Sequence, residues 1–268
     1  MTRCRLLLSA ILSFAALVGV AQGPLRAQSS KAEIEAAVRD YLKSNPEELQ
    51  RVVRDTLVNH PDWLQDVLTE IVRKRQAAAL IRGGEIAANE PKLLSSPHQV
   101  TLGNPEGDVT LVEFLDYNCG YCKRAMADML ALLEGDARLK IVLKEYPVLG
   151  PASVEAARVA IAVRMQDVDG SKYLAFHKAL LGSRGRADAA SAMAAARDAG
   201  LDMERLARDL VSDEVRLSIE ESQSLARAIG VTGTPAYVIG NNLVPGAVGS
   251  SALRSQIADL RKSRQSPH

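Results

Sequence analysis

The sequence has little cysteine, few aromatic residues and almost no net charge. Cysteine occurs 3 times in 268 residues, aromatic residues make up 4% of the chain, and Trp63 is its single tryptophan. So few aromatic side chains predict an aliphatic, alanine-rich core with much helix. Because 33 basic residues stand against 32 acidic ones, the formal net charge is +1. Nothing in this balance favours binding to nucleic acid or to an anionic membrane.

One apolar run stands at the N-terminus. Arg3 and Arg5 precede residues 6–21, which carry no charge, and small residues follow. This order of a short positive region, an apolar run and small residues is typical of a secretory signal peptide. We therefore predict a signal peptide over residues 1–27, cleaved near residue 21 or 27, and a periplasmic mature protein. The alternative is an uncleaved membrane anchor, for which the run is short.

Cleavage would remove Cys4 and leave Cys119 and Cys122. In an oxidising compartment, thiols are either paired or chemically active. An apolar strand runs directly into a predicted helix at this CxxC motif, so Cys119 falls at the helix start. Unpaired backbone N–H groups and the helix dipole favour a thiolate there, and Lys123 and Arg124 add positive charge. We expect Cys119 to be the nucleophile and Cys122 to resolve the mixed disulfides that Cys119 forms.

Other roles for this cysteine pair have less support. A zinc site would need two further ligands, but the four histidines are scattered singly at positions 60, 98, 177 and 268. A purely structural disulfide would close a four-residue loop and stabilise little, because the loop entropy is small. The sequence thus predicts no cofactor besides a redox-active disulfide and no metal. Two soft thiolates leave a Cu(I) site at Cys119 and Cys122 as an alternative.

Residues 31 to about 82 have the apolar spacing of helices and contain an internal repeat. Residues 38–52 align with residues 53–67, and each copy carries one proline, Pro46 or Pro61. A proline breaks a continuous helix but suits the first position of a new one. Three short helices are therefore predicted, with Asn45 and Glu48 forming a capping box at the second.

Apolar stripes on these helices need a partner, because isolated helices of this length are marginal in water. The stripes comprise Leu42, Leu49, Val52, Val53, Leu57, Trp63, Leu64, Val67, Leu68, Ile71 and Val72. Their partner is either the catalytic domain or the same segment of neighbouring chains. We predict the second, a homo-oligomer.

The remainder of the chain alternates strands and helices. We predict that Gly83-Gly84 ends the last N-terminal helix and that residues 89–97 are a connector. Strands follow at 109–115, 139–146 and 236–239, the last entering a hairpin through residues 240–242 into 243–244. Helices are expected at about 119–133, through most of 152–229, and at 251–261. This order predicts an α/β fold with an inserted helical subdomain at about 150–229.

The strand–CxxC–helix unit, the helical insertion and Gly230-Val-Thr-Gly-Thr-Pro235 together resemble the DsbA-like branch of the thioredoxin superfamily. The likeness covers about residues 97–262 and implies a thioredoxin-like fold. It also implies that Pro235 is cis and faces the CxxC loop, beside Thr234. A proline that opens a strand cannot donate to the ladder, so its neighbour is free to pair with an extended substrate chain. An ordinary trans turn proline is the alternative.

Glu113 is a carboxylate in a strand that otherwise reads as apolar on both faces. A buried carboxylate with a raised pKa is able to accept the Cys122 proton during exchange, and the resemblance implies an acidic residue at this position. Lys144 on the neighbouring strand is either the partner of Glu113 or a solvated edge residue. His177 lies on an amphipathic helix and is interpreted as structural.

The helices before the catalytic domain resemble those of the ScsC (suppressor of copper sensitivity) group, which implies a link with copper tolerance and a trimer, with a dimer next. We expect an oligomerisation segment over residues 28–90 and a DsbA-like domain over 91–268. The expected activity is that of a protein-disulfide isomerase or reductase, since Gly120-Tyr121 lacks a histidine that would strongly stabilise a thiolate. The alternatives are a disulfide-forming oxidase and a periplasmic Cu(I)-binding protein. Expected partners are misfolded exported proteins and a membrane redox partner.

Overall fold

The structure, a computed structural model, describes residues 30–167 and 170–265. The predicted signal peptide over residues 1–27 therefore lies outside the described residues. The chain divides between Thr69 and Glu70 into two compact units. Among the described residues, no helix is both long enough and apolar enough to cross a membrane.

The first unit is helical. It contains α1 (Lys31–Ser44), α2 (Pro46–Asn59) and the first part of α3 (Pro61–Ala88). Both repeat prolines stand at the first position of a helix, as predicted. The predicted capping box at Asn45 is wrong, because the Asn45 side chain instead donates to the carbonyl of Tyr41 at 2.8 Å. The capping box of this unit is formed by Ser30 and Glu33 at the start of α1.

Large apolar side chains of this unit are exposed in the chain by itself. Their exposed fractions lie between 41% and 72% for Ile34, Val38, Tyr41, Leu49, Val52, Val53, Val58, Trp63, Leu64, Val67 and Leu68. A helical unit with no buried residue in α1 or α2 has no core of its own. These side chains, the apolar stripe of the first unit, therefore need cover from elsewhere.

The last N-terminal helix does not end at Gly83-Gly84, where the sequence predicts its end. It continues to Ala88, because two glycines weaken a helix by only about 1 kcal/mol each relative to alanine and packing opposes that loss. Ile86 is 2% exposed and belongs to a core cluster with Phe114 and Val238. The expected connector also contains a short helix, α4 (Glu90–Leu94), which buries Leu93.

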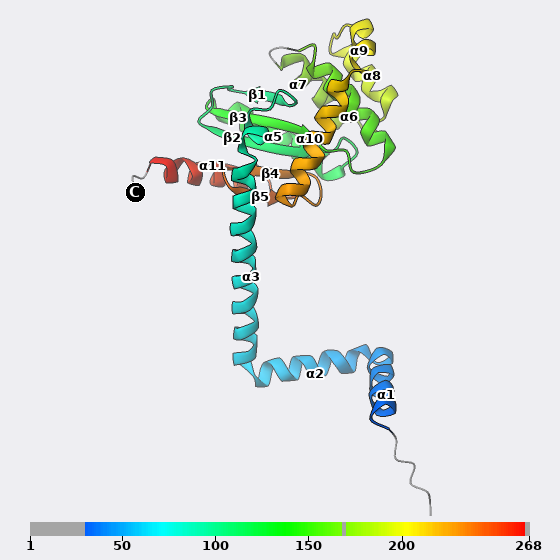
Figure 1. The fold of residues 1–268 in the computed structure, drawn as a ribbon, viewed down its shortest axis with the longest axis vertical. Helices are drawn as coiled ribbons and strands as arrows, with labels where there is room; N and C mark the ends of the chain where they lie inside the picture. Colours follow the sequence, from blue (N-terminus) through cyan, green and yellow to red (C-terminus); the bar gives the residue numbers. More distant parts are fainter. Residues whose placement is uncertain (1–29, 168–169, 266–268) are drawn as a thin grey trace, which may run out of the picture. The chain divides into compact units, whose positions relative to one another are not determined.

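The second unit is built on a mixed five-stranded sheet with the order β1-β3-β2-β4-β5 (Figure 1). Its strands are β1 (Val100–Gly103), β2 (Val109–Leu115), β3 (Leu139–Glu145), β4 (Ala236–Ile239) and β5 (Asn242–Pro245). The pair β2–β3 is parallel and the other neighbours are antiparallel. The four strands expected from the sequence are present, and β1 was missed.

Helices cover both faces of this sheet. They are α5 (Gly120–Gly135), α6 (Pro151–Arg164), α7 (Ser171–Gly182), α8 (Ala189–Asp198), α9 (Met203–Asp209), α10 (Asp213–Ile229) and α11 (Ser250–Gln265). One face packs Leu111, Ile141 and Leu143 against α5, α7 and α11. The other packs Val112 and Phe114 against α10 and the end of α3. The alternation along each strand follows from the two-residue period of side chains in a sheet.

The inserted helices lie together beside the sheet, with α6, α7, α8 and α9 forming one group (Figure 1). The last helix of the insertion, α10, returns the chain to the sheet. It ends at Gly230, whose φ of +74° is a left-handed cap that a glycine adopts without strain. The reversal at Gly230 directs residues 231–235 towards the start of β4. The fold is thus the expected α/β thioredoxin-like fold with a helical insertion.

Candidate active site

Cys119 and Cys122 stand where β2 gives way to α5. Four residues separate the end of β2 from the helix, and Cys119 is its N-cap, with the N–H of Lys123 donating to the Cys119 carbonyl at 3.0 Å. The side chain of Cys119 is 7% exposed and that of Cys122 is 1% exposed, and both are unbonded thiols. The exposure places Cys119 nearer the surface, which is the arrangement expected of a nucleophile and its resolving partner.

Thr234 and Pro235 lie against this cysteine. The Thr234–Pro235 peptide bond is cis, and the Cys119 Sγ donates to the Thr234 carbonyl oxygen at 3.1 Å although 115 residues separate them. Because β4 pairs antiparallel with β2, the start of β4 lies beside the end of β2. The structure therefore brings together four of the five residues expected at the site.

A groove of about 240 Å³ opens beside these residues. It is lined by Tyr121, residues 230–236, Leu243, Pro245 and Gly246. Tyr121, between the two cysteines, is 60% exposed. The groove thus joins the CxxC loop to the cis proline and to the edge strand β5, and its length of open backbone suits an extended chain.

Glu113, the fifth expected residue, is buried in the middle of β2. It is 5% exposed and stands opposite Leu143 and Tyr237 in the ladder. Burial, followed by the charge of Asp128, raises the pKa of Glu113 to about 8. Burial also raises the pKa of the Cys122 thiol, and the Glu113 charge adds to that shift. An ionised Glu113 therefore disfavours ionisation of Cys122.

Lys144 is not the partner of Glu113, and it is not a solvated edge residue. In the parallel ladder Glu113 lies opposite Leu143, so Lys144 points to the other face of the sheet. There it is fully buried, and its Nζ donates to the Lys92 carbonyl at 2.7 Å and to Glu221 at 3.0 Å. Burial lowers the pKa of Lys144 while Glu221 opposes that shift. Lys144 ties α4 and α10 to the sheet.

The basic residues after Cys122 have definite partners. The Lys123 Nζ donates to the carbonyls of Ser183 and Gly185, at 2.8 and 3.0 Å, and so fastens the loop after α7 to the first turn of α5. The Arg124 guanidinium lies over the Tyr121 ring, 4.3 Å from its centroid. The Arg124 charge therefore lies beside the CxxC loop, held by a cation–π contact, whereas the Lys123 charge lies against the loop after α7.

Sequence reasoning missed two residues that hold the segment before Cys119. The Asp116 carboxylate accepts from the N–H groups of Asn118, Val148 and Leu149 and from the Ser153 hydroxyl, at 2.7–3.0 Å. The Asn118 side chain donates to the Ala187 carbonyl at 2.8 Å and accepts from its N–H at 2.9 Å. The available signal was a run of polar residues directly between a buried strand and the CxxC motif. These contacts join the CxxC loop to the insertion.

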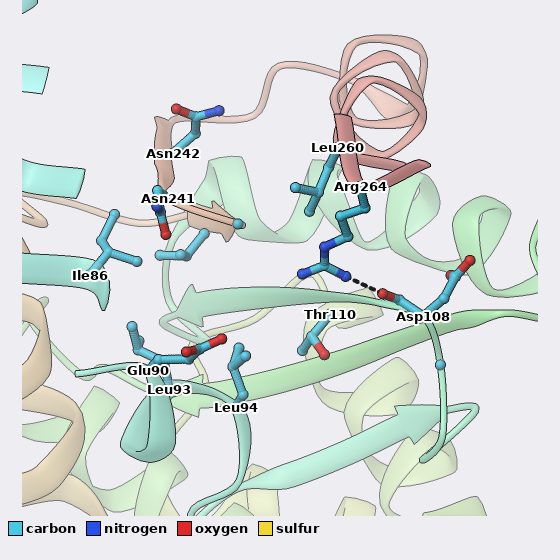
Figure 2. Close-up of a pocket in the computed structure, with 13 residues that line it drawn as sticks. Ile86, Glu90, Leu93, Leu94, Asp108, Thr110, Asn241, Asn242, Leu260 and Arg264 are labelled. Atoms are coloured by element: carbon cyan, nitrogen blue, oxygen red, sulfur yellow. Dashed lines mark hydrogen bonds between the residues drawn. The ribbon is translucent and has the colours of Figure 1, made fainter. Parts of the chain in front are cut away.

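The opposite end of the strands holds a second pocket, of about 570 Å³ (Figure 2). Asp108 and Thr110 border it at the start of β2, and the Arg264 side chain reaches over it and donates to the Asp108 backbone carbonyl. A seven-residue strand spans about 20 Å, so this pocket is remote from Cys119. It contains none of the expected site residues. In the described part of the chain, no group of three or more His, Cys, Asp or Glu side chains is placed to hold a metal ion.

Residues 110–258 match the family model of the DSBA-like thioredoxin domain. A thioredoxin-like oxidoreductase from Silicibacter pomeroyi is 45% identical with a TM-score of 0.61, covering 65% of this chain and 98% of that one. A linker-deletion mutant of Proteus mirabilis ScsC is 26% identical with a TM-score of 0.63, covering 88% and 99% of the two chains. A periplasmic thioredoxin-like protein from Salmonella enterica serovar Typhimurium is 29% identical, with a TM-score of 0.57 and coverages of 63% and 94%.

Two curated Na⁺/H⁺ antiporters, from Salinispora arenicola and Herminiimonas arsenicoxydans, match at 26% identity over 157 and 196 residues. The chain spans 24% and 29% of their lengths, about a quarter. The family model, by contrast, matches more than half of this chain and includes the CxxC motif and the cis proline. The chain therefore belongs to the DsbA-like family of thioredoxin-fold thiol–disulfide oxidoreductases, and ScsC is among its structural neighbours.

Proposed function

We propose that the chain is an exported isomerase or reductase of protein disulfides that acts through Cys119 and Cys122. One observation carries the proposal, namely that the more exposed cysteine caps a helix and its sulfur touches the backbone before the cis proline, 3.1 Å from the Thr234 oxygen. A substrate disulfide in the adjoining groove would reach the Cys119 sulfur while its backbone pairs beside Thr234.

The exchange begins when the Cys119 thiolate attacks one sulfur of a substrate disulfide. That S–S bond breaks, a mixed disulfide forms, and the other substrate sulfur leaves as a thiolate that takes a proton from solvent. In isomerisation, a different substrate thiolate then attacks the substrate sulfur of the mixed disulfide, so a new substrate disulfide forms and Cys119 leaves as a thiolate with no net change in electrons. In reduction, Cys122 attacks Cys119 instead, the reduced substrate leaves, and an external dithiol must later reduce the enzyme.

Glu113 is the group we assign to the proton of Cys122. Attack by Cys122 requires loss of its proton, and the raised pKa of this thiol makes that loss costly without a nearby base. The charge of Cys119 disappears when the mixed disulfide forms, which removes one cause of the raised pKa of Cys122 and eases transfer of its proton to the ionised fraction of Glu113. Glu113 then returns the proton when the thiols are regenerated.

Support for export and for a homo-oligomer comes from the N-terminal part of the chain. The charge and apolar pattern of residues 1–27 supports export to the periplasm. The apolar stripe of the first unit supports a homo-oligomer, a trimer before a dimer, because its side chains are exposed in the chain by itself. Several CxxC sites around a shared space suit the shuffling of disulfides in misfolded exported proteins, and a membrane redox partner would set the disulfide state.

Two assays on the same purified protein test the proposal. Catalytic amounts should reduce insulin disulfides and restore activity to ribonuclease with scrambled disulfides, and Cys119→Ser should abolish both. Activity only in oxidising a reduced protein would replace the proposal with a DsbA-type oxidase. Tight binding of one Cu(I) per chain without either activity would replace it with a copper-binding role at the same two thiolates.

A further inference from the structure

Tyr117 is buried two residues before Cys119, and its hydroxyl is shared among three side chains. It lies 3.1 Å from Glu145 Oε1, 3.0 Å from the Tyr173 hydroxyl and 3.1 Å from His177 Nδ1. The Tyr173 hydroxyl also donates to Glu145 Oε1, at 2.6 Å. All four side chains are at most 5% exposed. They come from the loop after β2, from the end of β3 and from α7.

This network contains a carboxyl, Glu145, that forms no ion pair within the described part of the chain. Glu145 Oε1 accepts from both tyrosines, but Glu145 Oε2 is buried without a hydrogen-bond partner in the described structure. The neighbouring imidazole does not supply a charge, because burial lowers the pKa of His177 to about 3. An ionised carboxylate would keep both tyrosine hydrogen bonds, but its second oxygen would be buried without a partner, which makes ionisation costly.

The remaining groups around Glu145 act in the same direction on balance. Burial raises the pKa of Glu145 to about 8, against the hydrogen bonds from Tyr173 and Tyr117. The charge of Asp116 raises it further, and that of Arg164 on α6 lowers it. At neutral pH the carboxyl is therefore protonated, and the network is uncharged.

We propose that Tyr117 is a positioning residue for Cys119, held by a buried hydrogen-bonded network with Glu145, Tyr173 and His177 that gains a negative charge when Glu145 loses its proton. The inference rests on the proposed function of Cys119 as the nucleophile. Tyr117 acts through the backbone, because only Asn118 stands between it and the N-cap cysteine. Since Tyr173 and His177 belong to α7, the network links the helical insertion to the placement of the reactive sulfur.

Paired Tyr→Phe variants separate positioning from stability. Tyr117→Phe and Tyr173→Phe each remove one hydroxyl from the same network, but only Tyr117 is joined to Cys119 by the chain. The measurement is the rate of iodoacetamide alkylation at Cys119 in the reduced full-length protein, beside the thermal midpoint of each variant. A small displacement of a reacting group is costly, so Tyr117→Phe should slow alkylation by about fivefold or more, and Tyr173→Phe by less than about twofold. Equal slowing by both variants would overturn the positioning role.

The pH profile of the same reaction tests the proton. Glu145→Gln keeps an oxygen that accepts from both tyrosines but cannot ionise, so its alkylation rate at neutral pH should stay within about twofold of the wild-type rate. At pH values above the pKa of Glu145, the alkylation rate of the wild-type protein should depart from the curve expected for ionisation of a single thiol. The rate of Glu145→Gln should follow that curve throughout. Superimposable profiles would disprove the dependence on Glu145.

Failure of the proposed function and failure of the positioning role of Tyr117 would give different results. If Cys119 of the wild-type protein is no more reactive than an ordinary thiol, the proposed function fails. If wild-type Cys119 is reactive and the two Tyr→Phe variants behave alike, only the positioning role of Tyr117 fails.

Discussion

The two cysteines differ in burial, and this difference supports the roles that we propose for them. Because Cys119 is nearer the surface and Cys122 is almost fully buried, we expect a substrate sulfur to reach the first and not the second. Cys122→Ala should therefore accumulate mixed disulfides with exported proteins, since the resolving thiol is absent, whereas Cys119→Ala should accumulate almost none. Non-reducing gels of acid-quenched cells, with each band tested for loss after reduction, provide the measurement. Trapping by Cys119→Ala alone would reverse the assignment.

Glu113 makes stability depend on pH in a definite direction. Its pKa rises from an ordinary value of 4.5 to about 8 in the folded protein. Between these values the folded state holds a proton that the unfolded state has lost, so the free energy of unfolding falls as pH rises through this window, by at most about 1.4 kcal/mol per pH unit. Glu113→Gln should remove the part of this fall that Glu113 contributes, while Glu145, whose pKa is also raised to about 8, keeps its own part. Urea unfolding at several pH values from 4.5 to 8 measures it, and parallel curves for variant and wild type would contradict the raised pKa of Glu113.

Individual site residues were predictable from the sequence where their spacing defines a motif. The CxxC motif follows from spacing, and the resemblance points to the Thr234–Pro235 dipeptide and to Glu113. The fold brings the cysteines and this dipeptide together, and Glu113 lies buried within β2. The partner of Lys144 was not predictable, because a shift of one residue in strand register moves a side chain to the other face of the sheet. The Tyr117 network was also not predictable, since the partners of Tyr117 are 28 to 60 residues away from it in the sequence.

At the scale of elements, alanine substitutions at two glycines with different surroundings test the packing. A Cβ at Gly84 in α3 would meet no atom within 4 Å, whereas at Gly240 it would lie 3.0 Å from the Leu260 side chain at a φ of +55°. Gly84→Ala should raise the free energy of unfolding by about 0.5–1 kcal/mol, because alanine favours the helix. Gly240→Ala should lower the free energy of unfolding. Denaturant titration of both variants checks the signs, and destabilisation by Gly84→Ala would mean that α3 is not helical there.

Periodicity predicted the long elements well and the short ones poorly. The strands at 109–115 and 139–145 and the helix after Cys119 carry strong patterns and were found. β1 has four residues and exists because it pairs with β3, about forty residues away, so nothing local marks it. The glycines at 83 and 84 show the reverse case, in which burial of Ile86 outweighs a local preference to end the helix.

At the scale of the whole molecule, the apolar stripe of the first unit predicts assembly. Val53, 48% exposed in the chain by itself, belongs to that stripe, and the adjacent Arg54 does not. Val53→Glu would place a charge in the subunit contact and should shift the mass measured by light scattering from an oligomer to a monomer. Arg54→Glu introduces the same residue outside the stripe and should leave the mass unchanged. A monomeric wild-type protein would exclude the assembly.

Assembly and activity should be separable in the same variant. Reduction of insulin needs one CxxC site, whereas shuffling of several disulfides profits from neighbouring sites. Val53→Glu should therefore keep the insulin activity and lose most of the ability to reactivate scrambled ribonuclease. Equal retention of both activities would show that shuffling does not require neighbouring chains.

The contact between Cys119 and Thr234 exists only while the sulfur carries a hydrogen. Once Cys119 is bonded to another sulfur, the part-buried Thr234 carbonyl loses its donor and is free to accept from another. We propose that an N–H of the attached substrate chain takes that place. When exchange ends and the thiol returns, the Cys119 S–H competes for the same oxygen and displaces the substrate. The backbone beside the cis proline would thereby bind a substrate chain more strongly in the mixed disulfide than after the product is released.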